Sequence, residues 1–177
     1  MSQFQEPVII VSKCIGFASC RYDGQFISNE FVDKMRKRVN FIPVCPEVGI
    51  GLDTPRPSLR LVEKDNDIRL IQPKTGKDLT ELMYEFTENF LQDLPEIDGF
   101  ILKNRSPTCG NKDSKLYLVD NNNPIGKTSG LFTKKIKKQF SHLPIEDEGR
   151  LTNFKIREHF LTKIFNLAKF RKVKKEN

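Results

Sequence analysis

Residues 8–14, VIIVSKC, are a short apolar run that ends in a cysteine. FIPVC at residues 41–45 repeats this arrangement, and GFILK at residues 99–103 is followed shortly by SPTCG at residues 106–110. Each apolar run is too short, and too rich in Val, Ile and Phe, to favour a helix, so we predict three buried strands. The sequence therefore places a cysteine at or just beyond the end of each of three core strands.

The rest of the chain alternates between helical and extended patterns. Helices are predicted at residues 29–39, 79–91 and 130–140, and a last helix is capped by Thr152 or Asn153. Residues 59–63 and 68–72 are predicted to form a hairpin, and residues 116–119 a short fourth core strand. Irregular or turn-rich connections are expected at residues 46–58, 120–127 and 144–150. This alternation indicates a single α/β domain, with a mostly parallel sheet flanked by helices in a Rossmann-like arrangement and a C-terminal helix.

Cys14, Cys45 and Cys109 are separated by 31 and 64 residues, yet they can converge in space. In open parallel sheets, ligands bind at the carboxyl ends of the strands, where these cysteines fall. The pattern suggests a metal site of three thiolates with an open fourth position. The alternative for each cysteine is a purely structural role, as a small hydrophobic side chain buried in the core. Cys20 lies in the polar stretch ASCRYDG and is interpreted as a bystander.

The net charge of +7 is concentrated in the last quarter of the chain. Residues 134–177 carry 13 Lys or Arg and 5 Asp or Glu, whereas residues 1–133 carry 17 and 18. Nucleic-acid binding usually requires a basic face on the folded module. The cysteine-bearing body is therefore not expected to bind nucleic acid as its main function.

A length of 177 residues suits one domain with at most a short appendage. The opening MSQFQEP has no apolar signal-peptide core, and no run approaches the roughly 18 apolar residues of a membrane span. We therefore expect a cytoplasmic protein that does not associate with a membrane. Thiols in that compartment more often bind metals or act in catalysis than form disulfides.

Four strings carry a family resemblance: SKCIGFASCRYDG, PVCPEVGIGLDTPRP, QPKTGKDLT and ILKNRSPTCG. In order and spacing they resemble the thiouracil desulfidase (TudS-like) family, from about residue 8 to residue 150. LPIEDEGRL is similar to the sequence with which that domain usually ends. The resemblance implies a TudS-like desulfidase domain over residues 1–150. Residues 151–177 would be a basic C-terminal helix, the remnant or start of the second module found in larger relatives.

The resemblance also implies a 4Fe–4S cluster held by Cys14, Cys45 and Cys109, with the fourth iron free to bind a substrate sulfur. Cys20 is not carried over as a ligand. The chemistry of the residues agrees, because soft thiolates select iron–sulfur or zinc centres. The implied reaction is hydrolytic cleavage of a carbon–sulfur bond without net redox. The implied substrate is a thiolated pyrimidine base or nucleotide, thiouracil or 4-thiouridine monophosphate.

Two side chains beside the cysteines are candidates for catalysis. Glu47, two residues after Cys45, can relay protons to or from water. Its alternative is a solvated loop glutamate. Ser106, three residues before Cys109, can hydrogen-bond to substrate or water, and its alternative is a residue that only forms the Ser-Pro turn.

Five further residues are predicted to bind substrate. They are Arg21, Tyr22, Asp23, Arg56 and Lys103. Arginine and lysine suit a nucleotide phosphate, the first through its bidentate fork and the second as a point charge. The alternative for each is a structural salt bridge. The acids at residues 146–148 are interpreted as a solvated linker.

Two other functional classes stay open. Cys20 could complete a closed four-thiolate zinc site in a structural module, although its spacing from Cys14 is longer than that of a zinc knuckle. Alternatively, the tail KFRKVKK could supply phosphate contacts to RNA. A brown, anaerobically purified protein would favour the cluster, and a colourless zinc protein the structural module.

Overall fold

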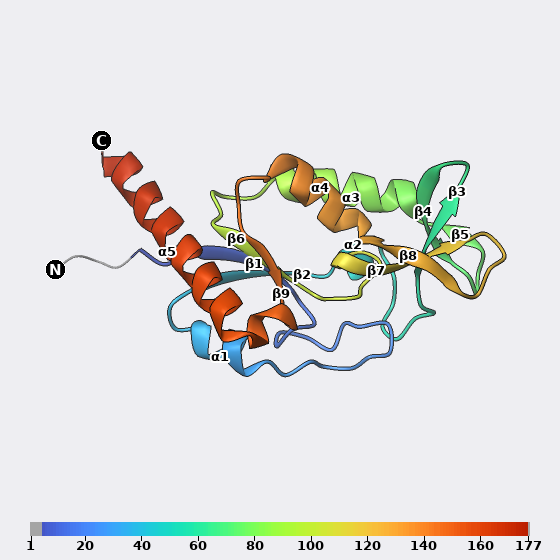
Figure 1. The fold of residues 1–177 in the computed structure, drawn as a ribbon, viewed down its shortest axis with the longest axis horizontal. Helices are drawn as coiled ribbons and strands as arrows, with labels where there is room; N and C mark the ends of the chain where they lie inside the picture. Colours follow the sequence, from blue (N-terminus) through green and yellow to red (C-terminus); the bar gives the residue numbers. More distant parts are fainter. Residues whose placement is uncertain (1–4, 177) are drawn as a thin grey trace.

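Strand β1 (Val8–Ser12) lies inside a four-stranded sheet with the order β2-β1-β6-β9 (Figure 1). Its other strands are β2 (Asn40–Val44), β6 (Gly99–Leu102) and β9 (Ile145–Asp147), and all pairings are parallel. The three predicted apolar strands are therefore confirmed. The computed structural model describes residues 5–176, so residues 1–4 of the opening segment, where we expect no signal peptide, lie outside it.

Both faces of this sheet are covered by helices (Figure 1). The pleat of β1 turns Ile10 toward α3 (Thr80–Gln92) and α4 (Leu131–Gln139), whose apolar residues share its core cluster. Ile9 and Val11 point the opposite way, toward α1 (Glu30–Met35) and α5 (Phe154–Glu176). This arrangement confirms the predicted α/β class, a mostly parallel sheet flanked by helices in one domain.

A second sheet lies at the other end of the molecule, with the order β5-β4-β3-β7-β8 (Figure 1). Its strands are β3 (Arg60–Lys64), β4 (Asp67–Gln72), β5 (Lys77–Asp78), β7 (Asn111–Leu118) and β8 (Pro124–Ser129). The predicted β3–β4 hairpin is confirmed, and Asp65 and Asn66 turn it with positive φ angles of 52° and 62°.

Three connections differ from the prediction. The predicted core strand 116–119 is the end of the longer β7, in the second sheet, and the turn-rich stretch 120–127 already contains the start of β8. The loop 46–58 begins with a short helix, α2 (Pro46–Gly49), because Pro46 suits a first helical position. The linker 144–150 contains β9, and a 3₁₀ turn, η1 (Arg150–Thr152), follows.

The C-terminal helix α5 packs along the α1 side of the sheet through Phe160, Ile164 and Ala168. The amphipathic pattern of this last helix predicts that its basic end, including Arg171, faces solvent, but for Arg171 this prediction is wrong. The guanidinium lies 2.7 Å from the buried carboxylate of Asp98, at the amino end of β6. No helix in the described part of the chain is both long and apolar enough to cross a membrane.

Candidate metal centre and active site

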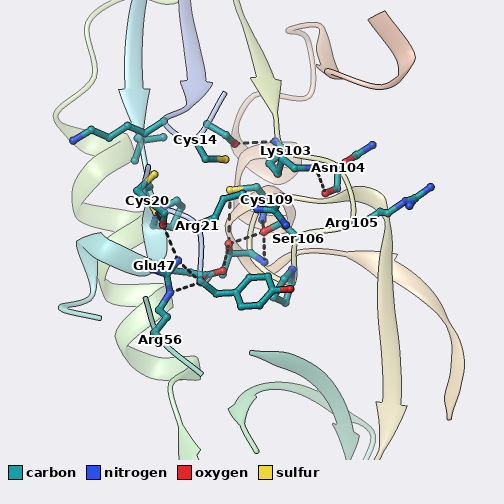
Figure 2. A pocket seen from close by; sticks show the side chains of 18 residues that line it. Cys14, Cys20, Arg21, Glu47, Arg56, Lys103, Asn104, Arg105, Ser106 and Cys109 are labelled. Atoms are coloured by element: carbon teal, nitrogen blue, oxygen red, sulfur yellow. Dashed lines mark hydrogen bonds and ion pairs between the residues drawn. The ribbon is translucent and has the colours of Figure 1, made fainter. Parts of the chain in front are cut away.

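A cavity of about 350 Å³ opens at the carboxyl ends of β1, β2 and β6 (Figure 2). All four cysteines of the chain line it, as free thiols: Cys14, Cys20, Cys45 and Cys109. The expectation that the strand ends bring distant cysteines to one place is confirmed. Glu47, Ser106 and several cations line the same cavity, so thiols and acid–base groups share one space.

The loop after β1 brings Cys20 back to the strand ends. The backbone of Ile27 bonds to the carbonyl of Cys14 at 3.1 Å and to the N–H of Gly16 at 2.8 Å, which closes the loop. Gly16 permits this closure with φ +80°. Cys20 is consequently buried beside the thiols of Cys14 and Cys45. Its polar stretch gives no sign of this position, and its interpretation as a bystander that is not a ligand stays a prediction.

Cys109 is held by the start of α4. The N–H of Cys109 donates to Ser106 Oγ at 3.0 Å, and the Cys109 carbonyl accepts from Thr133 Oγ1 at 2.8 Å. Gly130 allows this close packing, since a Cβ there would come within 2.3 Å of the Thr108 backbone. The hydroxyl groups of Ser106 and Thr133 therefore hold the backbone of Cys109 at both its N–H and its carbonyl.

The thiols are poorly suited to carry negative charge by themselves. Burial raises the pKa of Cys109 to about 12, although a hydrogen bond from Ser12 opposes this. The adjacent Cys20 thiol and burial hold the pKa of Cys45 far above its usual range. Thiolates here need a nearby cation, which a metal centre supplies. The donor set thus fits a thiophilic metal or an iron–sulfur cluster.

Within residues 5–176, no three His, Cys, Asp or Glu side chains are gathered in the geometry that holds a single metal ion. The expectation that three sulfurs would meet near one point is therefore not met in that strict sense. A four-iron cluster has different requirements, because each ligand sulfur binds a separate iron. Thiols spread around a common cavity suit such a cluster better than they suit one zinc ion.

Glu47 is buried in the first turn of α2, so the alternative of a solvated loop glutamate is wrong. Arg56 Nε donates to its Oε2 at 2.8 Å, and Arg56 Nη2 forms an ion pair with the same oxygen at 2.7 Å. The other Arg56 donors reach the carbonyls of Cys20 and Asp53 and the hydroxyl of Thr54. All three nitrogens of the Arg56 guanidinium thus have protein partners, and its predicted contact to a phosphate stays a prediction.

Ser106 and Thr108 connect Glu47 to the Cys109 loop. Ser106 Oγ accepts from the N–H groups of Thr108 and Cys109, which confirms that it shapes the turn. Its hydroxyl also lies 3.0 Å from that of Thr108. Thr108 in turn donates to Glu47 Oε1 at 3.2 Å. The two predicted catalytic residues are therefore linked through a third one that the sequence interpretation missed.

The predicted substrate-binding residues do not all face the cavity. Arg21 and Tyr22 line it, and Tyr22 is 44% exposed. Asp23 is not among the lining residues and instead accepts from Gln25 N–H in its own turn. The Arg21 guanidinium lies 3.8 Å from Asp23 and is 28% exposed, so an anionic substrate can reach it.

Lys103 lines the cavity, but its ammonium group is already paired with a carboxylate. Its Nζ lies 2.5 Å from Glu148 Oε1 and donates to both oxygens of Asn104. The three ammonium protons thus have protein acceptors, and the predicted phosphate contact is not available in this arrangement. Glu148 was interpreted as part of a solvated linker, which is wrong, because it is half-buried against this lysine.

The fold and the cavity agree with the class of protein to which the chain belongs. Residues 9–148 match the family described as 2-thiouracil desulfurase. This match covers well over half of the chain. The chain is therefore a member of the 2-thiouracil desulfurase family, a family of sulfur-removing enzymes.

Two individual proteins are similar to it. The chain is 33% identical over 110 residues to uncharacterized protein YbbK of Bacillus subtilis (strain 168). This match covers 58% of this chain and 73% of YbbK. It also matches the solved structure of the 4Fe-4S-dependent thiouracil desulfidase TudS, with a TM-score of 0.64 and 25% identity. That match covers 87% of this chain and 99% of TudS, so the two share a fold.

Proposed function

We propose that this chain removes sulfur from a thiolated pyrimidine, thiouracil or 4-thiouridine monophosphate, with a 4Fe–4S cluster held by Cys14, Cys45 and Cys109. The observation that carries the proposal is the meeting of these thiols with a buried carboxylate in one cavity. When bound, the cluster supplies a Lewis-acidic iron with affinity for soft sulfur. The dependence of TudS on such a cluster supports this assignment.

The proposed reaction is hydrolytic. Water supplies the oxygen that replaces sulfur on the ring carbon, and the sulfur departs as sulfide, so no electrons are gained or lost. Glu47 accepts a proton from the attacking water and returns it to the departing sulfide or the ring nitrogen. Arg56 keeps the carboxylate oriented for this exchange because it holds Oε2.

Two neighbouring residues that line the cavity are proposed to contact the base and the phosphate of the substrate. Tyr22 offers an exposed ring against which a pyrimidine can stack. Arg21, which also lines the cavity, is the cation proposed to bind a nucleotide phosphate. A cytoplasmic location is proposed because all four thiols are free.

A four-thiolate zinc site is the second candidate, because Cys20 lies beside the Cys14 and Cys45 thiols. It would be closed and structural. Anaerobic purification separates the two candidates by colour, metal content and acid-labile sulfide. A stoichiometric zinc ion without iron or sulfide would favour the structural module.

The activity itself is tested with cluster-loaded protein and thiouracil in water enriched in oxygen-18, without any reductant or oxidant. We expect uracil and sulfide in equal amounts, with one labelled oxygen in each uracil. Uracil formation that requires an electron donor would exclude the hydrolytic route. Loaded protein that releases no sulfide from the free base or the nucleotide would exclude the function.

A further inference from the structure

The hydroxyl of Ser106 has its hydrogen-bonding positions filled by its own loop. Its oxygen accepts the N–H of Thr108 at 3.2 Å and the N–H of Cys109 at 3.0 Å. A serine hydroxyl has two acceptor positions and one donor. Since both acceptor positions are taken, Ser106 must be the donor in its remaining contact, to Thr108 Oγ1 at 3.0 Å.

Thr108 then has only its own proton to give. Its oxygen lies 3.2 Å from Glu47 Oε1 and 3.7 Å from Cys109 Sγ. The carboxylate is the nearer and the stronger acceptor, so the proton points to Glu47. Thr108 is only 1% exposed, which keeps bulk water away from this hydroxyl. The hydrogen bonds therefore run in one direction, from Ser106 through Thr108 to Glu47.

Different residues thus hold the two oxygens of the Glu47 carboxylate. Arg56 holds Oε2 by a hydrogen bond from Nε and an ion pair from Nη2, and Thr108 donates to Oε1. We propose that Thr108 is a positioning residue for Glu47, and that Ser106 acts through Thr108 instead of touching the substrate. The inference rests on the proposed function, in which Glu47 exchanges a proton with water.

A catalytic carboxylate is effective only when its reacting oxygen is held in place. Arg56 by itself fixes one oxygen and leaves the other free to swing about the terminal torsion. The Thr108 hydroxyl removes that freedom and partners a buried oxygen that would otherwise lack a donor. Because the contact does not involve substrate, its loss should lower kcat and leave KM nearly unchanged.

Thr108→Val tests the proposal, since it removes the hydroxyl and keeps the shape of the side chain. In cluster-loaded protein we expect kcat for thiouracil to fall about 10–100-fold, with KM within about twofold. Thr108→Ser should recover most of kcat. Thr87→Val is the matched control, because Thr87 is also fully buried and its hydroxyl donates to the Met83 carbonyl within α3. An unchanged kcat in Thr108→Val would overturn the proposal.

The order of the chain is tested by combining Thr108→Val with Ser106→Ala. Because Ser106 Oγ also accepts the N–H of Cys109, kcat is compared per bound cluster. If Ser106 acts on Glu47 through Thr108, the double variant should then be no slower than Thr108→Val alone. Losses that multiply would show that Ser106 acts separately, and would overturn that part of the proposal.

Cluster-free protein gives a readout that does not depend on turnover. The urea midpoints of Thr108→Val, Glu47→Gln and the double variant should show losses that do not add, because the two side chains share a hydrogen bond. Additive losses would contradict the contact. If the losses are coupled but loaded wild-type protein releases no sulfide, the proposed function fails while the hold of Thr108 on Glu47 stands.

Discussion

At the scale of single residues, the Glu47–Arg56 pair decides what the cavity can do. Removing two charges from water is costly, and close geometry with additional hydrogen bonds must offset that cost. Arg56 meets this condition, since carbonyls and a hydroxyl satisfy the donors that Glu47 does not use. The pair therefore presents a carboxylate of fixed orientation beside the thiols.

Glu47→Gln should lower turnover by about 10²–10⁴-fold, the usual contribution of a general acid–base group. Iron content and binding of a thiopyrimidine should persist. Asp98→Asn is a matched control, because it also breaks a buried pair with an arginine, but at the amino end of β6, away from the cavity. Steady-state kinetics on folded variants measure the effect. A loss below about tenfold would demote Glu47 to a structural role.

Arg56→Gln should destabilise the protein by about 3–5 kcal/mol, since it leaves the Glu47 charge buried without its partner. Urea unfolding measures the loss. If Arg56 instead bound a phosphate, the variant would raise KM for the nucleotide and spare both KM for the free base and stability. The ratio of the two KM values therefore distinguishes the structural role from the one that the sequence suggested.

At the scale of elements, β9 ends in an aspartate, Asp147, whose burial disfavours its charged form. Asp147 is 4% exposed, and burial raises its pKa above the ordinary 3.8, although N–H groups of the following turn oppose this. The folded state therefore binds this proton more tightly than the unfolded chain does. The stability contributed by the protonated form is complete below pH 3.8 and is lost as pH rises through the folded-state pKa.

Asp147→Asn should flatten this part of the pH dependence. The amide oxygen can still accept from Arg150 N–H, but it carries no charge to desolvate. Relative to wild type, the variant should gain stability as pH rises from about 4 to 7. Urea unfolding at several pH values checks the sign. A difference that shrinks with rising pH would mean that the carboxylate stabilises β9.

The helix α5 is joined to the domain by its apolar stripe and by the Arg171–Asp98 pair. Arg171→Leu should cost about 3–5 kcal/mol because the Asp98 charge stays buried. Deleting the chain from Asn153 onward should lower stability more, while cluster content and affinity for a thiolated nucleotide persist. Loss of small-substrate binding in a folded deletion variant would place the helix in the site.

At the scale of the whole molecule, the central sheet and the gathering of the cysteines could be predicted, because short, continuous apolar runs mark β1, β2 and β6. The strands β8 and β9 could not. The first is largely exposed, and the second is the charged triplet Ile-Glu-Asp, so neither has the apolar alternation of a typical strand. Their places follow from pairing with distant strands.

Within the site, sequence motifs predicted the residue types better than their partners. Thr108 stands inside SPTCG, next to a predicted ligand, and that proximity was the only signal for it. Its carboxylate partner is 61 positions away in the chain. The partners of Arg56 could not be predicted for the same reason, since they lie in its own loop, in the loop that holds Cys20 and in α2. Such contacts depend on tertiary structure.

The tail is the part of the molecule to which RNA binding was assigned as an alternative. Several of its basic side chains, among them Lys169 and Lys174, are exposed, whereas Arg171 is committed to Asp98. The division into a desulfidase domain over residues 1–150 and a helical module over 151–177 stays a prediction. A salt-dependent affinity for RNA that disappears with the tail would support the RNA-associated alternative.

The central claim, a cluster held by three of the four thiols, is tested most directly by iron and acid-labile sulfide content after anaerobic reconstitution of four Cys→Ser variants. Cys14→Ser, Cys45→Ser and Cys109→Ser should each lose the cluster and the release of sulfide from thiouracil. Cys20→Ser should keep both, although its thiol lies beside two of the others. Loss of the cluster in Cys20→Ser, with retention in any one of the other three, would contradict the account.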